Sequence, residues 1–191
     1  TAPTTPPMPA FSPDPRRRAA EEKCLADIEA FGLHVLRIRG DDEYPEYAYS
    51  VGLPTLGQPE VLVLGLPADV AQALINRVAD LVDEGRRFAD GDTVHDIADG
   101  FPVVFRAVPA AQAAAHCKWI AWYHEGAPVE VLQLVYPDRA GRWPWEAGID
   151  DAFAWQQPVL ATAPVPAWAA DPAPPARKAR RRSVTPRFTN I

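Results

Sequence analysis

The chain has 191 residues, a net charge of −6 and 48% hydrophobic residues, enough for one domain whose core needs no disulfide or metal to stabilise it. No apolar run approaches the ~20 residues of a membrane-spanning helix, so we expect no membrane partner. The N-terminal residues lack the hydrophobic core of a secretory signal, and the two cysteines match no disulfide framework or metal spacing, which together predict a cytoplasmic location.

The first 18 residues are rich in proline and end in three consecutive arginines, Arg16 to Arg18. Proline fixes φ and lacks an amide donor, so we predict a disordered, basic arm over residues 1–18. Helix formers then predominate from Ala19 to Ala30, and Gly32 follows as a stop signal. This pattern predicts the first helix.

Three strands are predicted next. Residues 33–38 form the first, and residues 47–53 the second, with Tyr47, Tyr49 and Val51 on one face. A polar turn over residues 40–43 separates them. The near-continuous apolar run over residues 61–66 is typical of a central strand that is covered on both faces.

The second half of the domain alternates helices and strands. Residues 67–84 carry apolar side chains at helical spacing, and Pro109 is predicted to begin a long helix that ends near His124. Residues 101–108 and 129–135 complete the strands. The order predicts an α+β domain over residues 19–160, with a mainly antiparallel mixed sheet of about five or six strands packed against two or three helices and flanked by Pro-rich tails.

Two motifs lie within this domain. The first is Tyr47-Ala-Tyr-Ser-Val-Gly-Leu53, followed by Gly57-Gln-Pro-Glu60; the second comprises Gln133, Tyr136-Pro-Asp138, Gly141-Arg-Trp-Pro-Trp-Glu146 and Gln157-Pro158. In both motifs the chain resembles the bacterial domain-of-unknown-function family forty-two sixty-two (DUF4262). The resemblance implies no activity, cofactor or catalytic residue. Gln58 stands where we expect relatives often to carry His, so the resemblance implies no ligand or base at this position.

Residues 142–146, the tryptophan loop, crowd two indoles, a guanidinium and a carboxylate into one irregular segment. One interpretation is structural: Arg142 pairs with Glu146 between the rings of Trp143 and Trp145, which face different ways, at least one of them buried. The other is a recess where a planar or anionic ligand stacks. Its predicted ligand-binding residues are Tyr49, Glu60, Arg142, Trp143, Trp145 and Glu146.

A small enzyme is the alternative function, with a site around His34, Glu60, Arg142 and Glu146 and an unknown reaction. No metalloprotease, phosphate-loop or nucleophile-elbow motif supports it, and His116 and His124, about 12 Å apart on one predicted helix, cannot share a metal. We therefore predict no metal and no cofactor, and favour a non-enzymatic binding module. The sequence leaves open whether Cys24 and Cys117 pair.

Residues 161–191 are predicted to form a Pro-rich linker and a basic tail. Residues 19–176 carry 24 acidic and ten basic side chains, whereas residues 177–191 carry six basic and no acidic ones. Such a tail binds phosphate backbones by counterion release, or it is merely solvated. The predicted contacts to nucleic acid or another polyanion are Arg177, Lys178, Arg180, Arg181 and Arg182. The tryptophan loop and the charged tails also offer contact surfaces, so we expect that a protein partner is possible as well.

Overall fold

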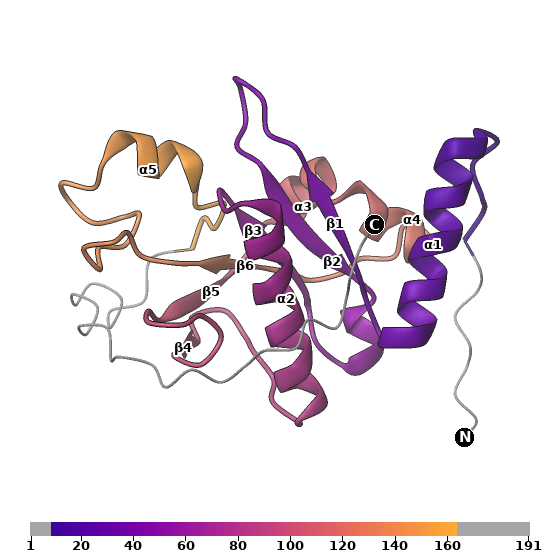
Figure 1. Ribbon diagram of the computed structural model, residues 1–191, viewed down its shortest axis with the longest axis horizontal. Helices are drawn as coiled ribbons and strands as arrows, with labels where there is room; N and C mark the ends of the chain where they lie inside the picture. The colour runs from indigo at the N-terminus through magenta and orange to yellow at the C-terminus, as the bar shows by residue number, and fades with distance from the viewer. Residues whose placement is uncertain (1–8, 164–191) are drawn as a thin grey trace.

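A six-stranded sheet with the order β1-β2-β3-β6-β5-β4 is the centre of the computed structural model, which describes residues 9–163 (Figure 1). Its strands are β1 (His34–Ile38), β2 (Tyr47–Val51), β3 (Glu60–Leu64), β4 (Thr93–Val94), β5 (Val103–Ala107) and β6 (Val131–Val135). The pair β3–β6 is parallel and the other four pairs are antiparallel. The predicted α+β class with a mainly antiparallel mixed sheet is confirmed.

Helices pack on both faces of this sheet. The described residues form α1 (Pro15–Phe31), α2 (Ala68–Asp83), α3 (Ala110–His116), α4 (Lys118–Tyr123), α5 (Asp151–Gln156) and the 3₁₀-helix η1 (Leu53–Leu56). One face packs against α2, and the opposite face packs against α3 and α4. Helix α1 lies beside α4 at one end of the molecule (Figure 1). None of the helices within residues 9–163 is long and apolar enough to cross a membrane.

Strand β3 lies between β2 and β6, and all five of its residues are buried. Val61 and Val63 belong to the apolar cluster under α2, whereas Leu62 and Leu64 belong to the cluster under α4. This alternation follows from the two-residue period of a strand. The prediction of a central strand covered on both faces is confirmed.

Helix α1 begins four residues before the predicted start at Ala19. Pro15 occupies its first turn, where a missing amide donor costs nothing, and the Asp14 carboxylate caps the helix by accepting the Arg16 N–H at 3.0 Å. Residues 15–18, which we predicted to be part of the disordered arm, therefore belong to α1. Residues 1–8 and 164–191 lie outside the described residues, so for them the predicted disordered arm and the predicted Pro-rich linker and basic tail stay predictions.

The single long helix predicted from Pro109 to His124 is wrong, because the chain breaks at Cys117 (φ −110°, ψ 55°) into α3 and α4. Tyrosines of β2 satisfy backbone groups at the break: the Tyr47 hydroxyl donates to the His116 carbonyl at 3.1 Å, and the Tyr49 hydroxyl accepts the Trp119 N–H at 3.3 Å. The break buries the Cys117 side chain. His116 consequently ends α3, whereas His124 is the C-cap of α4.

Candidate functional site

Glu60, the first residue of β3, carries a fully buried carboxylate. One oxygen accepts a hydrogen bond from Ser50 Oγ at 2.5 Å, and the other accepts the Gly52 N–H at 2.6 Å. Ser50 Oγ in turn accepts the Val61 N–H at 2.8 Å. The two halves of the first sequence motif are therefore joined through one buried, hydrogen-bonded carboxylate.

The backbone at Gly52 has φ 118°, a left-handed conformation that side-chain-bearing residues rarely adopt. A Cβ at this position would also lie 2.9 Å from the carbonyl oxygen of Gly32. Both constraints require glycine here. The glycine of the motif thus places an amide donor against Glu60.

The imidazole of His124 approaches the same carboxylate from the end of α4. Its Nε2 lies 3.6 Å from Glu60 Oε1 and has no hydrogen-bond partner in the described part of the chain. Cys24 and Cys117 lie in the adjoining apolar cluster, and both are free. Burial, reinforced by nearby carboxylates that include Glu60, raises the pKa of each thiol to about 12. The thiols are therefore protonated at neutral pH, and the arrangement suits a structural role better than a nucleophilic one.

The tryptophan loop packs on the sheet. Trp143 is 2% exposed and lies against Val104 and Val135. The Trp143 and Trp145 rings are stacked, with centroids 5.4 Å apart and planes at 6°. We predicted rings that face different ways, and this is wrong because the Glu146 N–H donates to the Trp143 carbonyl at 3.0 Å. That bond closes a turn that folds Trp145 back over Trp143.

The predicted pair between Arg142 and Glu146 is also wrong. Arg142 Nη2 lies 2.8 Å from the Asp138 carboxylate, and its Nη1 donates to the Gly148 carbonyl at 2.6 Å. Burial disfavours the charged form of Asp138, but hydrogen bonds from Arg142 and Ala140 lower its pKa below the usual value. The Glu146 carboxylate instead accepts the Trp143 N–H. Arg142 and Glu146 therefore each stabilise the conformation of the tryptophan loop, but through different partners.

Three buried glutamines bond to backbone groups far away in the sequence, a feature that the sequence analysis missed. Gln58 bonds both backbone groups of Phe88, and Gln157 bonds both of Tyr136. Gln133 on β6 donates to the Pro158 carbonyl and accepts the Leu160 N–H, each at 2.9 Å. Each side-chain amide donates to a backbone carbonyl and accepts from a backbone N–H, as the backbone of a neighbouring strand would. The glutamine at position 58 therefore has a structural role.

The predicted site residues divide between the two ends of the sheet. Glu60 is opposite Val131 at the start of β6, whereas the tryptophan loop follows the end of β6, about 16 Å along the strand. Tyr49 is buried and bonded to α4. The structure therefore does not gather the six predicted ligand-binding residues into one recess. It likewise separates His34 and Glu60 from Arg142 and Glu146, the set named for an enzyme.

His34 connects β1 to α1. Its Nδ1 lies 2.6 Å from the Asp27 carboxylate, which also pairs with Lys23 at 2.8 Å. Burial lowers the pKa of His34 even though Asp27 favours the protonated ring. Burial opposes ionisation of Asp27, but hydrogen bonds from Lys23 and His34 lower its pKa. A neutral imidazole that donates Nδ1–H to an ionised carboxylate accounts for both directions.

These directions predict that the domain loses stability on acidification. The pKa of His34 is depressed from 6.5, so the folded state binds fewer protons than the unfolded state, and stability falls as pH drops below that value. The pKa of Asp27 is also lowered, so Asp27 adds a further loss of stability as the pH falls below 3.8, its ordinary pKa. We expect the free energy of unfolding, measured in urea between about pH 7 and pH 5, to decline in the wild type and less in His34→Gln. An equal decline in both proteins would remove His34 as the cause.

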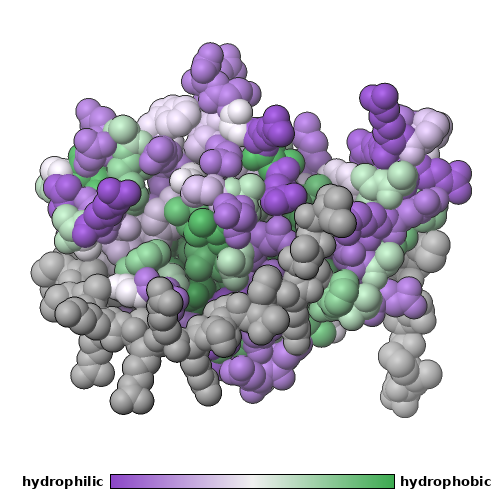
Figure 2. All heavy atoms as spheres, viewed as in Figure 1, coloured by the Kyte–Doolittle hydropathy of each residue, from purple (hydrophilic) through white to green (hydrophobic). Residues whose placement is uncertain are grey.

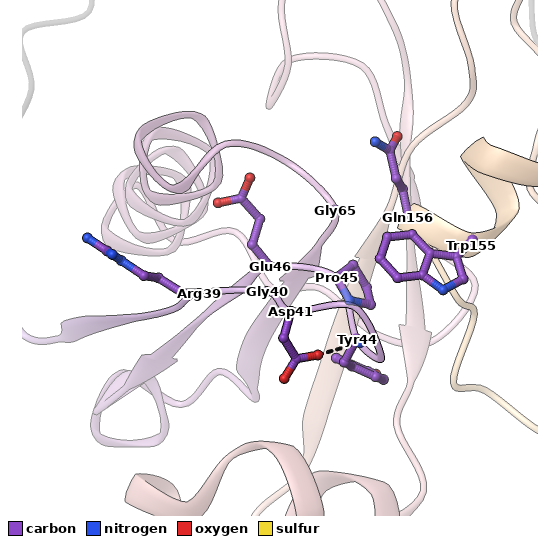
Figure 3. Close-up of a pocket in the computed structure, with 9 residues that line it drawn as sticks. All are labelled: Arg39, Gly40, Asp41, Tyr44, Pro45, Glu46, Gly65, Trp155 and Gln156. Carbon is purple, nitrogen blue, oxygen red and sulfur yellow. Dashed lines mark hydrogen bonds between the residues drawn. The ribbon is translucent and has the colours of Figure 1, made fainter.

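An open cavity of about 420 Å³ lies between α5 and residues 39–46, the tip of the β1–β2 hairpin (Figure 3). Trp155, which is 49% exposed, lines it together with Tyr44 and Pro45. The Glu46 and Arg39 side chains lie toward the other side in Figure 3. The sequence analysis missed this cavity, because it assigned residues 40–43 to a polar turn and did not predict α5.

The fold is the α+β domain that the order of the predicted elements indicated, and the two motifs lie at its buried carboxylate and its tryptophan loop. A family model described as a domain of unknown function (DUF4262) matches residues 27–150, and the chain belongs to this family. No curated protein and no solved structure matches the chain. The matched residues include Glu60 and the tryptophan loop but end before α5, so Trp155 lies outside them.

Proposed function

We propose that the protein is a non-enzymatic binding module that contacts nucleic acid or another polyanion through residues 177–182, the basic segment. The carrying observation is the separation of charge: five of these six residues are basic, in a tail without acid, while residues 19–176 have a net charge of −14. A dense cluster of cations binds a phosphate backbone by releasing its counterions, without reading base sequence. The basic segment lies outside the described residues.

The hydrogen bonds and ion pairs of the candidate catalytic side chains support a binding role rather than catalysis. His34 is paired with Asp27, Glu60 with Ser50 and Gly52, and Arg142 with Asp138. His34 and Glu60 thus stabilise two separate parts of the fold, and Arg142 and Glu146 a third, the tryptophan loop. The two free, buried cysteines support the cytoplasmic location that belongs to this proposal, because thiols persist in a reducing compartment.

Binding of single-stranded RNA by the full chain tests the proposal. With the six cations of residues 177–191 engaged, we expect the logarithm of the association constant to fall with the logarithm of salt concentration with a slope of about −4. The measurement is fluorescence anisotropy of labelled RNA over a salt series. Replacing Arg177, Lys178, Arg180, Arg181 and Arg182 with Gln should abolish binding, while replacing the four arginines with Lys preserves the charge and should preserve it.

Both variants keep the length of the chain and leave the domain unchanged, so their unfolding curves should match the wild type. Affinity that does not depend on salt would contradict the proposal. So would binding that persists in the Gln variant, because the contact would then reside elsewhere in the protein.

A further inference from the structure

The cavity beside the hairpin tip is lined by two aromatic side chains, Tyr44 and Trp155. Trp155 forms one wall and lies near Pro45 (Figure 3). Tyr44 is held in place by His116, whose ring stacks on it at 4.6 Å and whose Nε2 lies 3.2 Å from the Tyr44 hydroxyl. Aromatic walls of this kind bind proline rings, which lose little conformational freedom on docking.

The charged side chains that line the cavity are Asp41, Glu46 and Arg39, a net charge of −1. Asp42 and Glu43 follow Asp41 in the same hairpin, which gives residues 39–46 as a whole a net charge of −3. Asp42 and Glu43 are exposed. The β1–β2 hairpin to which they belong projects from the domain in Figure 1, and its projecting end is hydrophilic in Figure 2. Arg39 extends away from the aromatic side of the cavity, as Figure 3 shows. A cationic group next to a docked proline would therefore meet carboxylates.

We propose that this cavity binds a proline-rich, basic peptide, and that its occupant is the chain's own segment Pro172-Ala-Pro-Pro-Ala-Arg-Lys178. Three prolines in this segment match the aromatic side of the cavity. Arg177 and Lys178, which follow the last proline after Ala176, match the carboxylates of the hairpin. The inference concerns a site that the proposed binding of polyanions does not use.

The tether between the domain and this segment is long enough. The Ala163 carbonyl accepts a hydrogen bond from Arg106 at 3.0 Å, and Arg106 is opposite Gln133 in the β5–β6 ladder. From there the cavity residue Gly65 lies two strand spacings and about three strand residues away, roughly 15 Å. The nine residues from 163 to 172 can span about 30 Å. Docking within one molecule is therefore feasible.

Docking has a consequence for the basic segment. It occupies Arg177 and Lys178 and leaves Arg180 to Arg182 outside the cavity. The docked chain therefore offers fewer cations to a phosphate backbone than the undocked chain. A polyanion and the carboxylates of the hairpin compete for the same two side chains.

Paramagnetic NMR on the full chain tests the inference without any nucleic acid, so its failure would leave the proposed polyanion binding untouched. A nitroxide is attached to the variant Ala170→Cys; Cys24 and Cys117 are buried and have pKa values of about 12, so they stay unlabelled. We expect the backbone amide signals of Tyr44 and Glu46 to lose most of their intensity relative to the reduced label. Reversing the tail charges with Arg177→Glu and Lys178→Glu should restore them.

Trp155→Ala should also restore these signals, whereas Phe31→Ala, which truncates an aromatic ring of similar exposure on α1, should not. Unchanged intensities in the parent protein would overturn the inference, as would broadening that persists in Trp155→Ala. A sample that mixes isotope-labelled protein without nitroxide and unlabelled protein with nitroxide identifies the source of the tail. Equal broadening in that sample would assign the cavity to a second copy and overturn intramolecular docking.

Discussion

Truncation of Trp143 to alanine is expected to lower the free energy of unfolding by about 3–5 kcal/mol, the range for a large aromatic removed from a core. Trp143 is 2% exposed and packs against Val104 and Val135 on adjacent strands. It also supports the stacked ring of Trp145. Its removal therefore leaves a cavity and also exposes apolar surface on the second indole.

Urea unfolding followed by circular dichroism measures this loss, and two other tryptophans are matched controls. Trp145→Ala should cost less because this ring is only partly buried, and Trp155→Ala should cost least because that side chain is 49% exposed. A double variant of Trp143 and Trp145 should show a coupling of about 0.5–1.5 kcal/mol from the stacked pair. Equal losses in Trp143→Ala and Trp155→Ala would contradict the packing described above.

The second large effect is expected at Glu60. In Glu60→Ala the Ser50 hydroxyl and the Gly52 N–H both lose their acceptor in a fully buried site. An unsatisfied buried group costs about 1–3 kcal/mol, so we expect a total loss of about 3–5 kcal/mol with the cavity included. The C-terminal end of β2 and the N-terminal end of β3, which this carboxylate joins, should lose their hydrogen bonds first.

Glu60→Gln is the matched variant, because its amide oxygen can still accept the Gly52 N–H while its size stays the same. It should lose less stability than Glu60→Ala. Amide hydrogen exchange at Gly52 and Val61 locates the effect, since the Val61 N–H donates to Ser50 Oγ. Protection that is unchanged in Glu60→Ala would show that the carboxylate does not stabilise this end of the sheet.

The two motifs of the sequence have separate structural explanations. The first surrounds the Glu60 carboxylate, whose donors come from Ser50 and Gly52. In the second, Gln133 and Gln157 bond the backbone of residues that precede or follow the tryptophan loop. The first motif therefore encodes hydrogen bonds between neighbouring strands, and the second encodes hydrogen bonds across more than 20 residues.

The sequence by itself determined the fold class and the longest elements. Residues 61–64 are apolar without interruption and α2 has apolar side chains at helical spacing, so local pattern alone identifies a buried strand and an amphipathic helix. Short elements carry too little pattern: the two residues of β4 and the six of α5 were not predicted. The break at Cys117 was missed because the tyrosines that stabilise it lie on β2.

The tertiary structure alone decided the partners of the site residues. Asp138 and Glu146 are each four residues from Arg142, so the sequence does not distinguish between them as partners. In the folded loop, in which Trp145 stacks on Trp143, Arg142 pairs with Asp138. Glu60 and the tryptophan loop came to opposite ends of the sheet because β3 and β6 run parallel. The cavity brings Tyr44 to Trp155 across more than a hundred residues. Periodicity reports which face of an element is apolar, but contacts between distant segments depend on strand order and chain direction, which no local pattern contains.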